Sequence, residues 1–154
     1  DKLRNAGRGP STERADVTDE TYPDGQIANE VLFRLRAEVL FADEAARARR
    51  LGVKVPGSDG PFFLAVGFLR PHLPFTAPKK YWDLYDPAAF TLAERTTPPD
   101  GAPSYAPQFG GELRTYHGEP KDGPIPPDHQ RRLVHGYYAA ISYMDAQLGR
   151  VLDA

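Results

Sequence analysis

The spacing of apolar residues predicts two long helices, one in each half of the chain. From about Asp24 to Leu51, apolar side chains recur at helical intervals, with Asp24 expected as the N-terminal cap and Gly52 as the C-terminal stop. The second helix is predicted to start near Pro126-Pro127-Asp128, because proline suits a first helical turn. The apolar positions are Ile27, Val31, Leu32, Leu35 and Val39 in the first helix, and Leu133, Tyr137, Ile141, Met144, Leu148, Val151 and Leu152 in the second.

Between these helices, a short and continuous apolar run predicts a buried strand. Phe62 to Leu69 contains no polar residue, a pattern typical of a strand covered on both faces. Pro71 and Pro74 follow, and each restrains its own backbone and disfavours the helical conformation in the residue before it. His72 is therefore expected in an extended segment past the carboxyl end of a strand, where ligands bind in open α/β sheets.

His72 is the residue in this pattern that suggests chemistry. An imidazole held in such a loop can donate a hydrogen bond to an anion or exchange a proton near neutral pH. The alternative is a purely structural histidine, which is the commoner role for a single histidine beside apolar sequence. The pattern of residues alone leaves both interpretations open.

The rest of the chain carries weaker signals. Residues 1–21 are polar and unpatterned and are predicted to form a loop, whereas Lys79 to Tyr85 is compatible with a short helix. Asp86 to Pro127 is a long stretch with little periodicity, which we expect to wrap a larger body or to line a cleft. One strand and two strong helices are too few for a complete α/β domain, so the partners of the predicted strand are expected outside this chain.

Composition and charge exclude several functions. The 154 residues carry a formal net charge of −2 with both signs mixed along the chain, which argues against binding to nucleic acid or to a membrane surface. No apolar run approaches the ~20 residues that a membrane-spanning helix needs. His117, His129 and His135 lack metal-ligand spacing and are interpreted as surface or packing residues. Cysteine is absent, as are a glycine-rich phosphate loop and a Gly-x-Ser-x-Gly turn.

Three blocks of sequence resemble the sulfatase family, most closely its iduronate-2-sulfatase branch. The first is PFFLAVGFLRPHLPFTAPKKYWDLYD, residues 61–86, with its Arg-Pro-His-x-Pro-Phe turn. The second combines Gly-Pro-Ile-Pro at 123–126 with a Tyr-x-Ala-x-x-x-Tyr-x-Asp-x-x-x-Gly-Arg helix at 137–150. The third, Tyr-Pro-Asp-Gly-Gln-Ile-Ala at 22–28, is similar to the family's entry into the preceding helix.

This resemblance implies the fold and the extent of the domain. The fold class would be α/β, as part of an alkaline-phosphatase-like sandwich whose sheet is incomplete in this chain. Residues 1–154 would be an internal segment of a single sulfatase catalytic domain. The family's nucleophile, a Cys or Ser in Cys/Ser-x-Pro-Ser-Arg that is oxidised to formylglycine, has no counterpart among these residues. Its paired aspartates and its Asp-His/Asn-Gly metal motif are also missing, so the nucleophile and the Ca²⁺ ligands are expected outside the chain.

The resemblance also implies an activity and a site. The parent enzyme would hydrolyse sulfate esters of carbohydrates by attack of formylglycine on sulfur, assisted by Ca²⁺, while the isolated chain is expected to be inactive. His72 would be the catalytic residue and would contact the sulfate ester together with Arg70 and Lys79. The partners would be a sulfated small molecule or glycan and the remainder of the sulfatase domain. A periplasmic, secreted or lysosomal-type location would follow from the family.

Two alternatives remain at this point. One is a phosphate or phosphonate monoesterase of the same superfamily, which the residues around the nucleophile would distinguish. The other is a non-catalytic fragment that binds anionic glycans.

Overall fold

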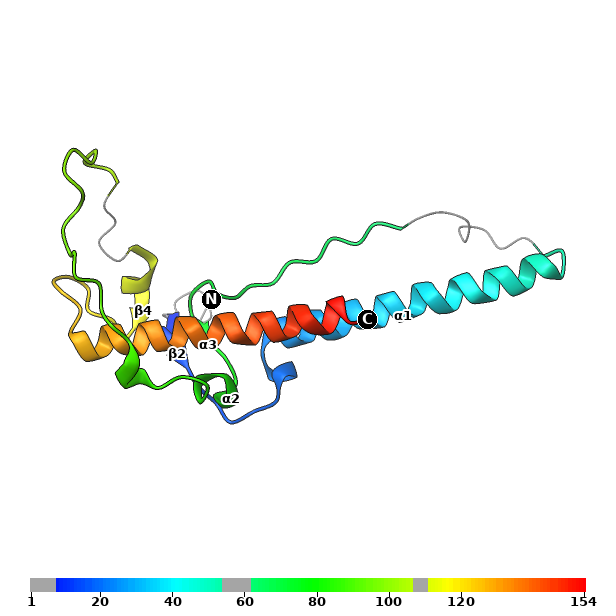
Figure 1. The fold of residues 1–154 in the computed structure, drawn as a ribbon, viewed down its shortest axis with the longest axis horizontal. Coiled ribbons are helices and arrows are strands. Elements are labelled where there is room, and N and C mark those ends of the chain that lie inside the picture. Colours follow the sequence, from blue (N-terminus) through cyan, green and yellow to red (C-terminus); the bar gives the residue numbers. More distant parts are fainter. Residues whose placement is uncertain (1–7, 54–61, 107–110) are drawn as a thin grey trace, which may run out of the picture. The chain divides into compact units, whose positions relative to one another are not determined.

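The computed structural model describes residues 8–53, 62–106 and 111–154, without the side chains of residues 38–40 (Figure 1). The chain divides into two compact units. The first comprises residues 1–18 and 70–143, and the second comprises residues 19–69 and 144–154. The last helix contributes residues to both.

In the second unit, helix α1 (Pro23–Arg50) confirms the first predicted helix. It follows a 3₁₀ turn, η1 (Asp19–Thr21), and ends as predicted, with Gly52 at φ 76°. The predicted cap is wrong: Tyr22 occupies the N-cap position, since Pro23 holds the residue before it in an extended conformation. Asp24 lies in the first turn instead, where its Oδ1 accepts a hydrogen bond from the Leu69 backbone N–H at 2.7 Å.

The start of α1 packs closely against η1 and against the end of the last helix. Gly25 is required there, because a Cβ at this position would lie 2.1 Å from the Asp19 carbonyl oxygen. Gln147 Nε2 donates to Asp19 Oδ2 at 3.1 Å, and Arg150 Nη2 donates to Asn29 Oδ1. These contacts are made within the second unit.

The predicted strand from Phe62 to Leu69 is not formed in this structure. The segment is irregular, and Phe63 is 93% exposed. A strand requires a hydrogen-bonding neighbour, and none of the described strands pairs with this segment. Leu64 to Gly67 instead borders the first turns of α1, and the two together line a groove of about 410 Å³ that includes Ile27 and Val31.

The first unit holds two short pairs of parallel strands. β1 (Arg8–Pro10) pairs with β4 (Tyr116–His117), and β2 (Thr12–Glu13) pairs with β3 (Phe75–Thr76). Residues 8–13, predicted to be loop, therefore connect two segments that are far apart in the sequence. Strands of two or three residues are too short to show an alternating pattern.

The core of this unit forms around Trp82, on helix α2 (Lys79–Trp82), which is shorter than the predicted span. The Trp82 Nε1–H donates to the Ala77 carbonyl at 3.1 Å. The carbonyl of Trp82 lies 2.7 Å from His135 Nε2, and the two rings meet edge to face at 4.8 Å. Two further 3₁₀ turns, η2 (Pro87–Ala89) and η3 (Gly111–Thr115), lie in the stretch that showed little periodicity.

Helix α3 (Pro127–Leu152) confirms the second predicted helix and its start, but not its buried face. The buried positions are Leu133, His135, Gly136, Ala139, Ala140, Tyr143 and Gln147, while Tyr137, Ile141, Leu148 and Leu152 of the predicted apolar stripe are exposed. The buried face is the one that carries small residues, because these allow α3 to approach its neighbours closely. At Gly136, a Cβ would lie 2.8 Å from the Trp82 ring and 3.0 Å from Phe75 Cβ.

The described structure thus combines helices with short parallel strands, in partial agreement with the predicted α/β class. The larger sheet of that class is not present among the described elements. None of the described helices has the length and apolar character needed to cross a membrane.

Candidate functional site

The candidate site is centred on the loop that leads into β3. Residues 70–74 form a turn followed by bends, with cis peptide bonds at Arg70–Pro71 and Leu73–Pro74. The extended segment predicted around His72 is therefore wrong, because the chain turns and bends there. The loop leaves the His72 side chain 69% exposed, which makes its imidazole accessible to a ligand.

Arg70 closes this loop upon itself. Its Nε donates to the Thr76 carbonyl at 3.2 Å, and its Nη2 donates to the Thr76 hydroxyl. Its Nη1 lies 3.4 Å from the His72 carbonyl. The planar guanidinium thus bridges the two ends of the loop, an arrangement that a single ammonium group cannot reproduce.

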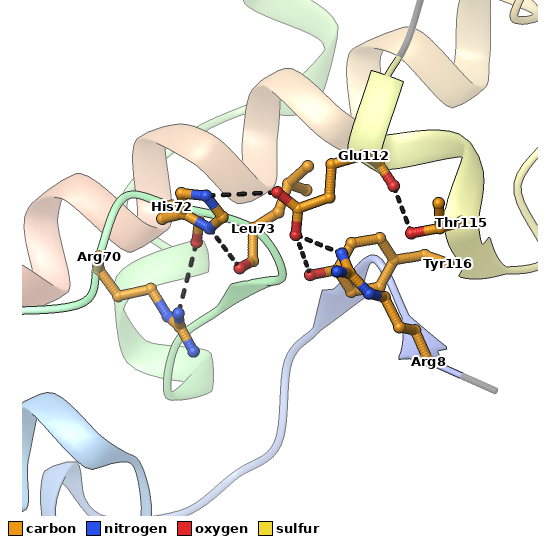
Figure 2. Close-up of polar contacts among 7 residues, drawn as sticks. All are labelled: Arg8, Arg70, His72, Leu73, Glu112, Thr115 and Tyr116. Carbon is orange, nitrogen blue, oxygen red and sulfur yellow. Dashed lines mark hydrogen bonds and ion pairs between the residues drawn. The ribbon is translucent and has the colours of Figure 1, made fainter. Parts of the chain in front are cut away.

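Both nitrogens of the His72 ring face oxygen acceptors (Figure 2). Nδ1 lies 2.8 Å from the Leu73 carbonyl oxygen, and Nε2 lies 3.3 Å from Oε2 of Glu112. A neutral imidazole carries one N–H and can donate to one acceptor only, whereas the protonated ring can donate to both. Both contacts are hydrogen bonds at the same time only when both ring nitrogens carry a proton.

Glu112, on η3, is itself held by two donors. Its Oε1 accepts hydrogen bonds from Arg8 Nη1 and from the Tyr116 hydroxyl, the latter at 3.0 Å (Figure 2). Desolvation raises the pKa of Glu112, but the hydrogen bonds from Tyr116 and Arg8 and the charges of His72 and Arg8 together bring it below its usual value. The carboxylate is therefore ionised near neutral pH. Burial and the neighbouring Glu112 raise the pKa of Tyr116, which keeps the hydroxyl protonated as a donor.

Lys79, the third residue predicted for the site, is engaged elsewhere. Its Nζ forms an ion pair with Asp83, four residues along the chain. The hydrogen bond from Lys79 is the main reason why the pKa of Asp83 lies below its usual value. The structure thus joins His72 and Arg70 through the loop, whereas the described contacts of Lys79 lead to Asp83.

Sequence reasoning missed the three residues that surround His72 in space. Glu112 lies in the stretch without periodicity, Tyr116 lies beside it, and Arg8 lies in the polar start of the chain. The one useful signal was the expectation that residues 86–127 line a cleft. The segments of Arg8 and Glu112 are brought together by the pairing of β1 with β4. Such long-range pairing leaves no spacing in the sequence that would connect either residue to His72.

A second polar cluster lies at the start of α3. The buried Glu119 accepts a hydrogen bond from the Ser11 hydroxyl, and its carboxylate oxygens lie 3.0 and 2.9 Å from His129 Nε2. Arg132 Nη2 lies 2.8 Å from the same ring nitrogen. Because Ser11 is buried, this cluster ties residues 8–13 to α3 and offers no accessible nucleophile.

The comparisons with known proteins establish the family. The sulfatase family profile matches residues 15–154. The chain is 35% identical to human iduronate 2-sulfatase and 36% identical to the mouse protein, over 94% and 91% of this chain. It is 29% identical to a choline-sulfatase of Rhizobium meliloti, over 90% of this chain. The chain belongs to the sulfatase family.

The matches cover only part of each relative. The aligned region is 29% of the length of human iduronate 2-sulfatase, 23% of the mouse protein and 24% of the choline-sulfatase. The chain thus spans less than a third of the curated relatives it matches.

Proposed function

We propose that this chain is an internal segment of a sulfatase catalytic domain, and that the protein containing it hydrolyses sulfate esters. The observation that carries the proposal is the exposed His72 imidazole, which is held in the family's Arg-Pro-His-x-Pro-Phe turn with acceptors at both ring nitrogens. A carbohydrate substrate is favoured because the iduronate 2-sulfatases, named for a sulfated sugar, match nearly the whole chain.

The chemistry of a sulfate ester explains what His72 would contribute. When the bond between sulfur and the alcohol oxygen breaks, negative charge develops on that oxygen, which must gain a proton to leave as an alcohol. An imidazolium at this position donates a hydrogen bond to the oxygen and then its proton. The attacking group would be the hydrated formylglycine implied by the family, supplied from outside these residues, and its oxygen would form the new bond to sulfur.

Arg70 and Lys79 would assist in different ways. Arg70 holds the loop that carries His72, and its positive charge adds to the attraction for an anionic ester. Lys79 is 40% exposed beside Asp83, so binding to a sulfate would require it to leave that pair. We therefore rank Arg70 above Lys79 as a contributor to the site.

The Ca²⁺ ion implied by the family finds no site in the described part of this chain. None of the described residues form a group of three or more His, Cys, Asp or Glu side chains that could hold a metal ion. Its ligands would be provided by the rest of the domain, and the role proposed for His72 includes no step through the metal. A periplasmic, secreted or lysosomal-type location remains a proposal from the family alone.

The proposal is tested by substituting His72 in the full-length protein that contains this chain. Wild type should hydrolyse an aryl sulfate faster than the matching aryl phosphate. His72→Ala should lower kcat/KM by about one to three orders of magnitude with little change in melting temperature, because it removes a proton donor and no buried contact. His72→Gln should recover part of the loss if hydrogen bonding dominates.

The matched control is His117→Ala, which removes another exposed histidine and should leave kcat/KM unchanged. Faster hydrolysis of the phosphate would favour the monoesterase alternative. A fall in melting temperature with normal kinetics in His72→Ala would assign His72 a structural role.

A further inference from the structure

Glu112 is the carboxylate nearest to the His72 ring among the described contacts, and it comes from a distant segment. The two residues are 40 positions apart, and η3 brings Oε2 of Glu112 to 3.3 Å from His72 Nε2. This separation is slightly longer than an ordinary N–H···O hydrogen bond. The Nε2 proton can therefore be shared between Glu112 and a second acceptor.

The surroundings of Glu112 are built to keep it charged and in place. Arg8 from β1 and the Tyr116 hydroxyl from β4 both donate to Oε1, which leaves Oε2 directed at the histidine (Figure 2). The Arg8 guanidinium also lies over the Tyr116 ring, 5.1 Å from its centroid. Two donors from different strands fix the carboxylate more firmly than one would.

The charges balance in a way that suits an anionic ligand. Glu112 is paired with Arg8, so the carboxylate does not cancel the positive charge of a protonated His72. Arg70, whose Nη1 lies 3.4 Å from the His72 carbonyl, adds a further positive charge on the same loop. When His72 is protonated, this cluster of charged side chains has a net positive charge, which favours the approach of an anion. Its members are Arg8, Arg70, His72 and Glu112.

We propose that Glu112 is a positioning residue for His72: its carboxylate orients the imidazole and keeps the proton on Nε2, ready for the leaving oxygen of the sulfate ester. The catalytic part of this inference rests on the proposed function, whereas the contact of Glu112 with the ring does not. The charge of His72 is one of the causes that lower the pKa of Glu112, which agrees with a direct interaction between the two side chains.

The test compares Glu112→Gln with wild type in the full-length protein. Gln keeps the shape of Glu112 and an oxygen for Arg8 and Tyr116, but removes the negative charge. We expect kcat/KM on an aryl sulfate to fall about tenfold. Glu94→Gln, an exposed glutamate in the same long stretch, should leave kcat/KM unchanged.

A second measurement keeps the inference independent of turnover. With histidine labelled at Cε1, the NMR signal that disappears in His72→Ala belongs to His72. In Glu112→Gln the position of this signal should change, because the charge 3.3 Å from Nε2 is lost, whereas Glu94→Gln should leave it in place. This result is expected even if the protein hydrolyses no sulfate ester. Wild type without sulfatase activity would therefore refute the proposed function while the NMR signal still tests the contact.

Two results would overturn the inference. One is a Glu112→Gln variant whose kcat/KM and His72 signal match those of wild type. The other is a rise in kcat/KM, which would show that Glu112 covers the ring and competes with the substrate.

Discussion

At the scale of single residues, surroundings and not residue type separate the four histidines. His72 and His117 are exposed, His129 contacts the buried Glu119, and His135 is buried against Trp82. Only His72 combines high exposure with oxygen acceptors at both ring nitrogens among the described contacts. The chemical role proposed for His72 rests on that geometry and on its place in the family's turn.

Arg70 gives a prediction at the same scale. Arg70→Lys should lower both kcat/KM and the free energy of unfolding, the latter by about 1 kcal/mol, because lysine cannot reproduce the contacts with Thr76 and the His72 carbonyl. Urea unfolding and aryl sulfate kinetics on the full-length protein would measure the two effects.

The control for Arg70→Lys is Arg34→Lys on α1, where the arginine forms an exposed pair with Glu30. This change should alter the free energy of unfolding by less than about 0.5 kcal/mol. If Arg70→Lys lowers kcat/KM but leaves the free energy of unfolding unchanged, Arg70 acts on the substrate and does not stabilise the loop.

At the scale of elements, the packing of α3 depends on one glycine. The N-terminal half of this helix approaches α2 and the β2–β3 pair so closely that a Cβ at Gly136 would touch Trp82, Phe75 and Thr12. The second glycine of α3, Gly149, has no atom within 4 Å of such a Cβ. A side chain is therefore excluded at Gly136 by close packing, whereas there is room for one at Gly149.

Alanine substitutions at these two glycines should give opposite results. Gly136→Ala should destabilise the protein by about 1–3 kcal/mol, because the methyl group forces apart a packed contact. Gly149→Ala should stabilise it by up to about 1 kcal/mol, since alanine has the higher helix propensity and meets nothing. Thermal or urea unfolding of both variants would measure the difference, and equal effects would contradict the packing described for α3.

At the scale of the whole molecule, the described structure leaves a large amount of apolar surface exposed. Phe62 and Phe63 are exposed in the segment predicted as a buried strand, and Tyr137, Ile141, Leu148 and Leu152 are exposed on α3. Neighbouring large apolar side chains that are exposed, such as Phe62 with Phe63, are typical of surfaces that another structure covers. This agrees with the proposal that further strands complete the sheet.

The isolated 154-residue chain should therefore self-associate and should not hydrolyse an aryl sulfate. Light scattering would detect the association, and Phe63→Ser should reduce it more than Leu84→Ser, a change at an exposed leucine outside the apolar run. In the full-length protein, Phe63→Ser should instead lower stability, because the side chain would be buried there. Sulfatase turnover by the purified chain, or a stable monomer, would contradict this description.

The sequence alone determined the two long helices, the role of Gly52 as the glycine just after the end of α1, and the family. Helices follow from contacts between residues three or four positions apart, so their pattern can be read locally. The turn that carries His72 was equally visible, because two prolines and a histidine at fixed spacing form a local motif.

Only the tertiary structure decided the surroundings of His72 and the buried face of α3. Glu112, Arg8 and Tyr116 meet because short strands pair across about a hundred residues, and such pairing leaves no periodic trace in the sequence. Gly136, and not the stripe of large apolar residues, selects the packed face, because close approach depends on the shape of the partner. The run from Phe62 to Leu69 shows the same principle: its residues favour a strand, but a strand forms only where a neighbour supplies the hydrogen bonds.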